Sequence, residues 1–185
     1  ADKSIVDNKW VDENIQADHG PLGAQYPDIK YIMEGDTPSY LYLIDNGLGS
    51  SEHPNWGSWG GRYEYYRPHT KTYFNEPETR EIWTDADDWV EVDGEVYIDN
   101  HATIWRWRKH YQNDFSAHMD WCVKKYEEAN HPPVVKLNHS NTIEVKSEQK
   151  VELDASLTSD PDKQKLHYKW FTSIPLINIR GIVNL

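Results

Sequence analysis

The stretch of sequence that decides the fold class reads YIMEGDTPSYLYLIDNG and begins at Tyr31. Its apolar start at 31–33 predicts a short strand, and the acidic residues that follow predict a turn. An acidic or hydroxyl side chain just before Pro38 can cap a helix with proline at its first position. Apolar residues then recur at helical spacing, so we expect a helix over 39–45 that the Asn-Gly pair ends. This order predicts an α/β domain with a ligand site at the turn.

Two further helices are predicted outside this stretch. Residues 10–17 have the pattern of a short helix, and the Gly- and Pro-containing segment 18–23 predicts a loop after it. A long helix is predicted over 102–128, with apolar residues on one face and charged residues such as Arg106 on a solvated or interdomain face. Residues 49–100 show little periodicity and predict an extended, loop-dominated insert.

A domain boundary is predicted at Asn130-His131-Pro132-Pro133, because paired prolines stiffen a connection and exclude helix. Short runs rich in β-branched and aromatic residues follow, separated by Asn, Ser, Asp and Pro turns. We therefore expect one domain at 1–129 and an all-β immunoglobulin-like sandwich at 130–185. The sandwich is expected to be partial, because a complete one has about seven strands and only about four are predicted here. The role of residues 172–185 stays open. The four predicted strands are 134–137, 142–145, 150–154 and 166–171.

The composition excludes several classes of partner. A net charge of -12 and the lack of a basic stripe with interleaved aromatics argue against nucleic acid. No apolar run approaches the roughly 18 residues that cross a bilayer, and residues 1–7 show no signal peptide. The chain holds 9 Trp and 12 Tyr against 3 Phe. Such rings either stack on sugars or bases or fill wet, irregular cores, and composition alone leaves both open.

Several spaced motifs run through the chain. They are EGDTPSYLYLI at 34–44, WGSWGGRY at 56–63, ATIWRWR at 102–108, QNDF at 112–115 and the Asp-Pro-Asp region at 153–170. In this order they resemble a bacterial family of cellulose-binding proteins with a nucleoside hydrolase-like domain. The resemblance implies that 1–129 is the C-terminal part of that Rossmann-like domain and that 130–185 begins the family's immunoglobulin-like module. It does not include the family's N-terminal half.

The resemblance also implies a function. Nucleoside hydrolases cleave the N-glycosidic bond between ribose and base, with a calcium ion that carboxylates hold and that orients the attacking water. The chain is thus expected to be a calcium-assisted, hydrolase-type glycosidase, incomplete without the aspartate cluster of the N-terminal half. The alternative is a non-catalytic carbohydrate-binding or cellulose-binding protein on the same scaffold. Secretion to the periplasm or the extracellular space follows from the family, and the oligomeric state and the substrate stay open.

The resemblance carries individual site residues as well. His19-Gly20-Pro21-Leu22 is similar to a family loop, His-Asp-Pro-Leu, that supplies a calcium-binding aspartate, but glycine stands at the aspartate's position. Asp36 is the nearest acidic residue at a suitable turn, so we predict it as a substitute metal ligand and catalytic carboxylate. His19 is predicted as catalytic and Glu34 as substrate-binding. The alternatives are a helix cap for Asp36, an ordinary strand end for Glu34 and a backbone-bonded loop histidine for His19.

The glycine- and tryptophan-rich loop at 56–62 is the other predicted binding element. Its glycines allow close approach of a ligand to the backbone. Trp56 and Trp59 can stack on a base or a pyranose face, and Arg62 can donate paired hydrogen bonds. The alternative is a surface loop packed on itself. The predicted partner is accordingly a nucleoside or a carbohydrate.

Overall fold

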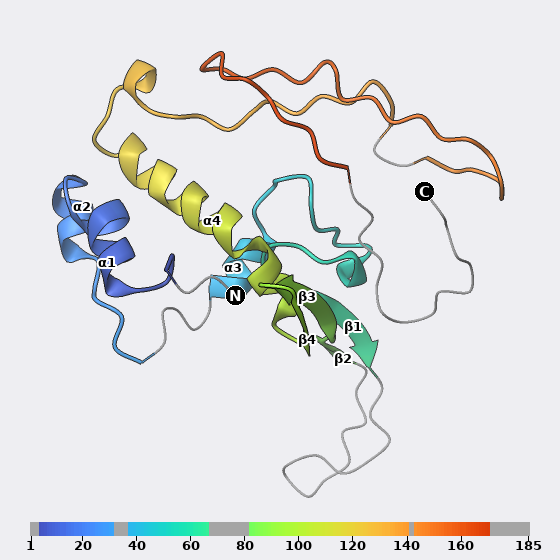
Figure 1. Ribbon diagram of the computed structural model, residues 1–185, viewed down its shortest axis with the longest axis horizontal. Helices are drawn as coiled ribbons and strands as arrows, with labels where there is room; N and C mark the ends of the chain where they lie inside the picture. Colours follow the sequence, from blue (N-terminus) through green and yellow to red (C-terminus); the bar gives the residue numbers. More distant parts are fainter. Residues whose placement is uncertain (1–3, 32–36, 67–81, 141–142, 171–185) are drawn as a thin grey trace, which may run out of the picture.

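The computed structural model describes residues 4–31, 37–66, 82–140 and 143–170. Its central element is the helix α4 (Ala102–Trp121), which runs between two groups of shorter elements (Figure 1). The N-terminal helices lie beside its C-terminal half, and the small sheets lie beside its N-terminal end. The described residues that follow α4 continue from its C-terminal end mostly as an extended segment. The helix therefore sets the separation of the parts that it contacts.

The N-terminal helical unit is held by a small apolar core. α1 (Asn8–Val11) continues directly into a π-helical segment, η1 (Asp12–Gln16). Val11 and Ile15 are four residues apart, which places them on one face, and both are fully buried against Met119 of α4. The short helix predicted at this place is confirmed, and its first residue lies slightly earlier than predicted.

The loop predicted after this helix is wrong, because a second helix, α2 (Gly20–Gln25), occupies it. Gly20 takes the left-handed conformation, with φ at 66°, and so reverses the chain at the helix start. Pro21 then stands in the first turn, where the missing N–H costs nothing. Gly23 is buried so closely that a Cβ there would lie 2.5 Å from the carbonyl oxygen of Ile15. Glycine and proline here shape a helix instead of preventing one.

The helix predicted over 39–45 is present as α3 (Thr37–Tyr42). It begins two residues earlier and ends three residues earlier than predicted, and Leu41 is its buried residue. Residues 32–36, which hold most of the predicted strand and the whole acidic turn, lie outside the described residues. The prediction of a strand followed by an acidic turn stays a prediction.

The insert predicted to be loop-dominated contains four strands, so that prediction is wrong for much of its length. β1 (Tyr63–Tyr66) pairs antiparallel with β2 (Ile82–Asp85). β3 (Asp88–Val92) pairs antiparallel with β4 (Glu95–Asp99). The second hairpin turns at Asp-Gly, where both residues have positive φ, 54° and 81°, as a two-residue type I′ turn requires. The described chain thus combines helices with small antiparallel sheets, and a Rossmann-like parallel sheet stays a prediction.

The long helix is confirmed, but it is shorter than predicted. α4 ends at Trp121, and residues up to Glu128 form a loop and a single 3-10 turn, η3 (Tyr126–Glu128). Its N-terminal residues Ala102 and Thr103 are buried against the sheet side. Among the described residues, no helix is long and apolar enough to span a bilayer.

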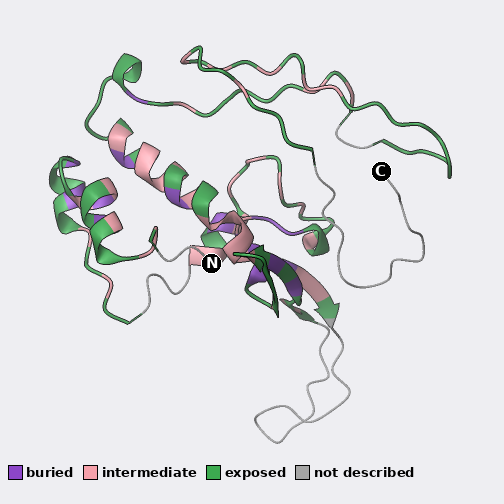
Figure 2. Cartoon of the chain, in the orientation of Figure 1, coloured by how far each residue is buried: buried purple, intermediate pink, exposed green. Residues whose placement is uncertain are grey.

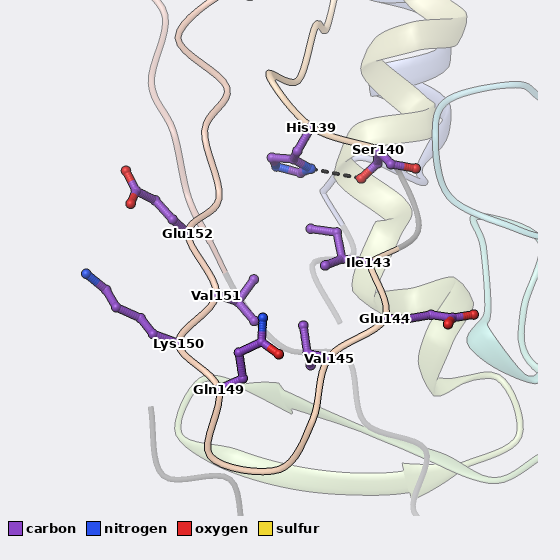
Figure 3. A pocket seen from close by; sticks show the side chains of 9 residues that line it. All are labelled: His139, Ser140, Ile143, Glu144, Val145, Gln149, Lys150, Val151 and Glu152. Atoms are coloured by element: carbon purple, nitrogen blue, oxygen red, sulfur yellow. Dashed lines mark hydrogen bonds between the residues drawn. The ribbon is translucent and has the colours of Figure 1, made fainter.

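The C-terminal extended segment, residues 130–140 and 143–170, is mostly exposed (Figure 2). Ile143, Val145 and Val151 point into the hollow between its two arms, and Glu144 points away (Figure 3). This alternation is that of strands. Within these described ranges, however, the single β-bridge joins Val134 and Ser159, and a further backbone hydrogen bond runs from Asn138 to Asp154. The immunoglobulin-like sandwich, and the division of the chain at residue 130, stay predictions.

Candidate functional site

The tryptophan loop, residues 53–62, is a compact turn between α3 and β1. It begins with a 3-10 turn, η2 (Pro54–Trp56). Ser58 and Gly61 then exchange backbone hydrogen bonds of 2.8 and 3.2 Å. Gly57 and Gly61 take positive φ values of 83° and 119°, which an L side chain would strain. The loop therefore has one defined conformation that glycine makes possible.

Trp56 is the exposed aromatic residue of this loop. It is 54% exposed, and its ring stacks on the imidazole of His53 at a centroid distance of 4.3 Å and an angle of 17°. Trp59, three residues later, is only partly exposed. One face of the Trp56 indole is thus supported by a second ring while much of the residue remains open to solvent. This is the form of an aromatic platform.

Arg62 lies beneath the loop instead of on its surface. The residue is 2% exposed. Its Nη1 donates to the carbonyl oxygen of Asn55 at 2.6 Å, and its Nε donates to Asp88 at 3.1 Å. Arg62 therefore joins the turn that carries Trp56 to the first residue of β3. Its predicted role in substrate binding stays a prediction.

Asp88 is the centre of the buried charge cluster, which we define as Asp88, Arg62, Arg106 and Thr103. Its carboxylate is 1% exposed and accepts hydrogen bonds from Arg106 at 2.9 Å, from the Thr103 hydroxyl and from the backbone N–H of Trp89 at 2.8 Å. Burial alone would raise the pKa of Asp88, but the hydrogen bonds from Arg106 and Thr103 outweigh it. The pKa falls from 3.8 to about 2.

The cluster binds three elements together at the N-terminal end of α4. Arg62 belongs to the tryptophan loop, Asp88 opens β3, and Thr103 and Arg106 belong to the first turns of α4. A carboxylate facing two guanidinium groups is well compensated for its burial. Asp88 and Thr103 were not predicted from the sequence, and Arg106 was expected on a solvated or interdomain face. Asp88 stands in an acidic run, and no spacing signal distinguished it from its neighbours.

Gly60 lies where the tryptophan loop packs against α3. Its substitution by alanine should destabilise the protein by about 1–3 kcal/mol through overpacking. A Cβ at this position would overlap the carbonyl oxygen of Pro38 and lie 2.5 Å from the amide nitrogen of Tyr42. Because both obstacles are backbone, the loop must move away from the helix. Urea unfolding followed by circular dichroism measures the loss. Asn55→Ala, in the same loop with an exposed side chain, is the control, and equal stability of the two variants would contradict the expectation.

His19 lies at the other end of α4. It is 8% exposed, and its Nε2 lies 3.2 Å from Asp120, whose same oxygen accepts from Lys124 at 2.6 Å. Burial works to raise the pKa of Asp120, but the hydrogen bonds from Lys124 and His19 lower it. The second ring nitrogen of His19 is buried and has no hydrogen-bond partner among the described residues.

The structure separates His19 from the tryptophan loop. The loop packs on Thr103 and the histidine on Asp120, and 17 helical residues correspond to about 25 Å at the usual rise. One small ligand cannot contact both. Glu34 and Asp36 lie outside the described residues, so their predicted roles in substrate binding, catalysis and metal ligation stay predictions.

The calcium ion implied by the family resemblance stays a prediction. Among the described residues, no group of three or more His, Cys, Asp and Glu side chains is arranged to hold a metal ion. The carboxylate of Asp88, which is 1% exposed, already forms ion pairs with Arg62 and Arg106. The chemistry that the described geometry does provide is an exposed aromatic platform on a rigid, charge-anchored loop.

Comparisons with known proteins agree with the motifs. Residues 1–63 match the family described as "Cellulose-binding Sde182, nucleoside hydrolase-like domain". A solved structure is also similar, that of a nucleoside hydrolase-related hypothetical protein from Saccharophagus degradans that is associated with carbohydrate metabolism. It is 31% identical with a TM-score of 0.65, and the match covers 85% of this chain and 38% of that one. The chain therefore spans well under half of that protein. No curated protein matches.

The family match includes every site residue that the sequence predicted. These residues are His19, Glu34, Asp36, Trp56, Trp59 and Arg62. The resemblance found in the motifs is thereby confirmed over the part of the chain that holds α1, α2, α3 and the tryptophan loop. Residues 1–63 are thus similar to the nucleoside hydrolase-like domain of cellulose-binding proteins.

Proposed function

We propose that this chain binds carbohydrate, with Trp56 as the platform on which a pyranose ring stacks. One observation carries the proposal: the Trp56 indole is exposed on one side and supported by the parallel ring of His53 on the other. Indole offers a flat apolar face to the C–H side of a sugar and an N–H to its hydroxyls. The family's cellulose-binding description favours a β-linked glucan as the ligand.

The buried charge cluster supports this proposal through preorganisation. A loop that is already ordered loses little conformational entropy when it binds, so more of the stacking energy appears as affinity. Arg62 fixes the turn before Trp56 through the carbonyl oxygen of Asn55, and Asp88 fixes Arg62. In this proposal Arg62 positions the platform instead of contacting the sugar.

Adsorption of the intact chain to microcrystalline cellulose tests the proposal. We expect saturable adsorption that soluble cellohexaose competes away, because a stacking site recognises the individual glucan chain. Adsorption that rises linearly with protein concentration, or that cellohexaose leaves unchanged, would show non-specific deposition and would overturn it. The family's description also leads us to propose a periplasmic or extracellular location, where such polymers occur.

Hydrolysis of an N-glycosidic or related sugar bond is the second candidate, and the match of residues 1–63 to a nucleoside hydrolase-like domain favours it. In this proposal Asp36 is a calcium ligand. Calorimetric titration of calcium, with and without ribose, should give saturable binding that Asp36→Asn abolishes, because the substitution removes the charged oxygen ligand. Absence of calcium binding, or equal binding by both proteins, would contradict the role of Asp36. Turnover of a nucleoside would separate catalysis from binding.

A further inference from the structure

A second aromatic cluster lies where α4 ends and the C-terminal extended segment begins. The ring of His131 is stacked between Tyr126, at a centroid distance of 3.9 Å and an angle of 27°, and Trp121, at 5.5 Å and 22°. The His131 side chain is only 12% exposed, whereas Tyr126 is 62% exposed. The cluster thus repeats the arrangement of the tryptophan loop, an exposed ring backed by an imidazole.

Hydrogen bonds fix this cluster from both sides. The backbone N–H of His131 donates to Asp162 at 2.6 Å, and its Nδ1 lies 3.0 Å from the other oxygen of the same carboxylate. Trp121 donates its indole N–H to the carbonyl oxygen of Asn130 at 2.8 Å, and Gln164 donates to the side-chain oxygen of Asn130 at 2.6 Å. The residue behind Tyr126 is therefore held by helix, linker and turn together.

A surface hollow of about 480 Å³ opens beside this cluster. Its volume lies within the range of roughly 300–1,000 Å³ typical of ligand pockets. Its lining combines one aromatic residue, Tyr126, with carboxylates, carboxamides and a lysine. Asn130 and Gln164 use one acceptor and one donor on each other, so each amide keeps further hydrogen-bonding capacity. The polar lining residues are Glu127, Glu128, Asn130, Asp162, Lys163 and Gln164.

We propose that this junction hollow is a second carbohydrate site, in which Tyr126 stacks on a pyranose ring and Asn130 and Glu127 bond its hydroxyl groups. An aromatic face combined with amide and carboxylate side chains matches the alternation of C–H faces and hydroxyl edges on a sugar. Because the Tyr126 ring is already stacked on His131, binding does not have to order a mobile side chain. This site goes beyond the one at Trp56 and does not depend on it.

The two sites occupy opposite ends of α4, which has a consequence for a polymeric ligand. The tryptophan loop packs on Thr103 at the N-terminal end of the helix, and Tyr126 follows its C-terminal end in the sequence. A helix of 20 residues is about 30 Å long, so neighbouring segments of one polysaccharide can reach both sites. Binding at the first raises the effective concentration at the second. We therefore expect tighter adsorption to the polymer than to a single short oligosaccharide.

Calorimetric titration of cellohexaose into Tyr126→Ala tests the second site. We expect this change to weaken the affinity of the junction hollow for cellohexaose about tenfold, because it removes the aromatic anchor. The same loss is expected in the otherwise unchanged chain and in a Trp56→Ala background. Tyr168→Ala, which removes a tyrosine of similar exposure, 54%, outside the hollow, should bind like the unchanged chain. Equal affinities of Tyr126→Ala and Tyr168→Ala in both backgrounds would overturn the proposal.

Two comparisons separate this result from misfolding and from the function of Trp56. Tyr126→Phe keeps the ring and its stacking on His131, so it should retain affinity close to that of the unchanged chain, and loss in this variant would overturn the role of the ring. If Trp56→Ala alone leaves binding unchanged while Tyr126→Ala weakens it, the proposal for Trp56 fails and the second site stands. If only Trp56→Ala weakens binding, the second site fails.

Discussion

Replacing Asp88 by alanine should lower the free energy of unfolding by about 3–5 kcal/mol, the usual cost of removing one partner of a buried ion pair. The change deletes the acceptor that Arg62, Arg106 and Thr103 share. Arg62 is 2% exposed, so its guanidinium cannot recover hydration without leaving the fold. We therefore expect a larger loss than the cavity alone would cause.

Urea unfolding followed by far-ultraviolet circular dichroism measures this loss. The control is Asp87→Ala, because Asp87 is the adjacent acidic residue and is exposed. Substitutions at such surface positions usually stay within about 0.5 kcal/mol. If Asp87→Ala and Asp88→Ala unfold at the same urea concentration, the cluster does not stabilise the fold in the way that its geometry indicates.

The pH dependence gives a second measurement on the same group. The pKa of Asp88 is about 2 in the folded protein against 3.8 ordinarily. A lowered folded-state pKa contributes stability that is fully present above the unfolded value and is lost as the pH falls through the folded one, on the order of 2 kcal/mol here. The stability gap between the unchanged chain and Asp88→Asn, which cannot ionise, should therefore narrow between about pH 5 and pH 2. A constant gap would contradict an ionised Asp88.

Trp56→Ala should reduce affinity for cellulose and for cellohexaose by tenfold or more, because a tryptophan that acts as a binding hot spot costs about 2 kcal/mol or more when truncated. The free energy of unfolding should change little, because Trp56 is 54% exposed and packs mainly on His53. Adsorption isotherms and calorimetry measure the two affinities. This combination of a large binding effect with a small stability effect distinguishes a ligand platform from a packing residue.

Trp170→Ala is the matched control for Trp56→Ala, because Trp170 has the same exposure, 54%, and lies in the C-terminal segment. Its affinity should equal that of the unchanged chain. His53→Ala should weaken binding by a smaller factor, since it removes the ring behind Trp56 but leaves the platform. If Trp56→Ala binds as Trp170→Ala does, the tryptophan loop is a surface turn packed on itself, which the sequence left as the alternative.

Local patterns in the sequence were sufficient for some elements of the fold. The period of apolar residues located α4, and the motifs before residue 63 indicated the family resemblance that residues 1–63 show. The hairpin of β3 and β4 also has a local signal, Asp93-Gly94 between alternating residues, which is typical of a type I′ turn. The hairpin was not predicted, because residues 49–100 were interpreted as loop-dominated from their lack of periodicity. The helix α2 was missed because Gly20 and Pro21 usually interrupt structure, and only packing showed that they start a helix.

The sequence by itself determined the resemblance that residues 1–63 bear to the family, the position of the long helix and the place of the aromatic loop. Only the tertiary structure decided that Arg62 lies under that loop, that Asp88 anchors it and that His19 lies at the far end of α4. The Arg62–Asp88 and Arg106–Asp88 contacts join residues 26 and 18 positions apart. Burial, which makes Asp88 decisive and its acidic neighbours ordinary, is a property of the packed chain, because the same carboxylate costs energy when buried alone and stabilises when two arginines face it.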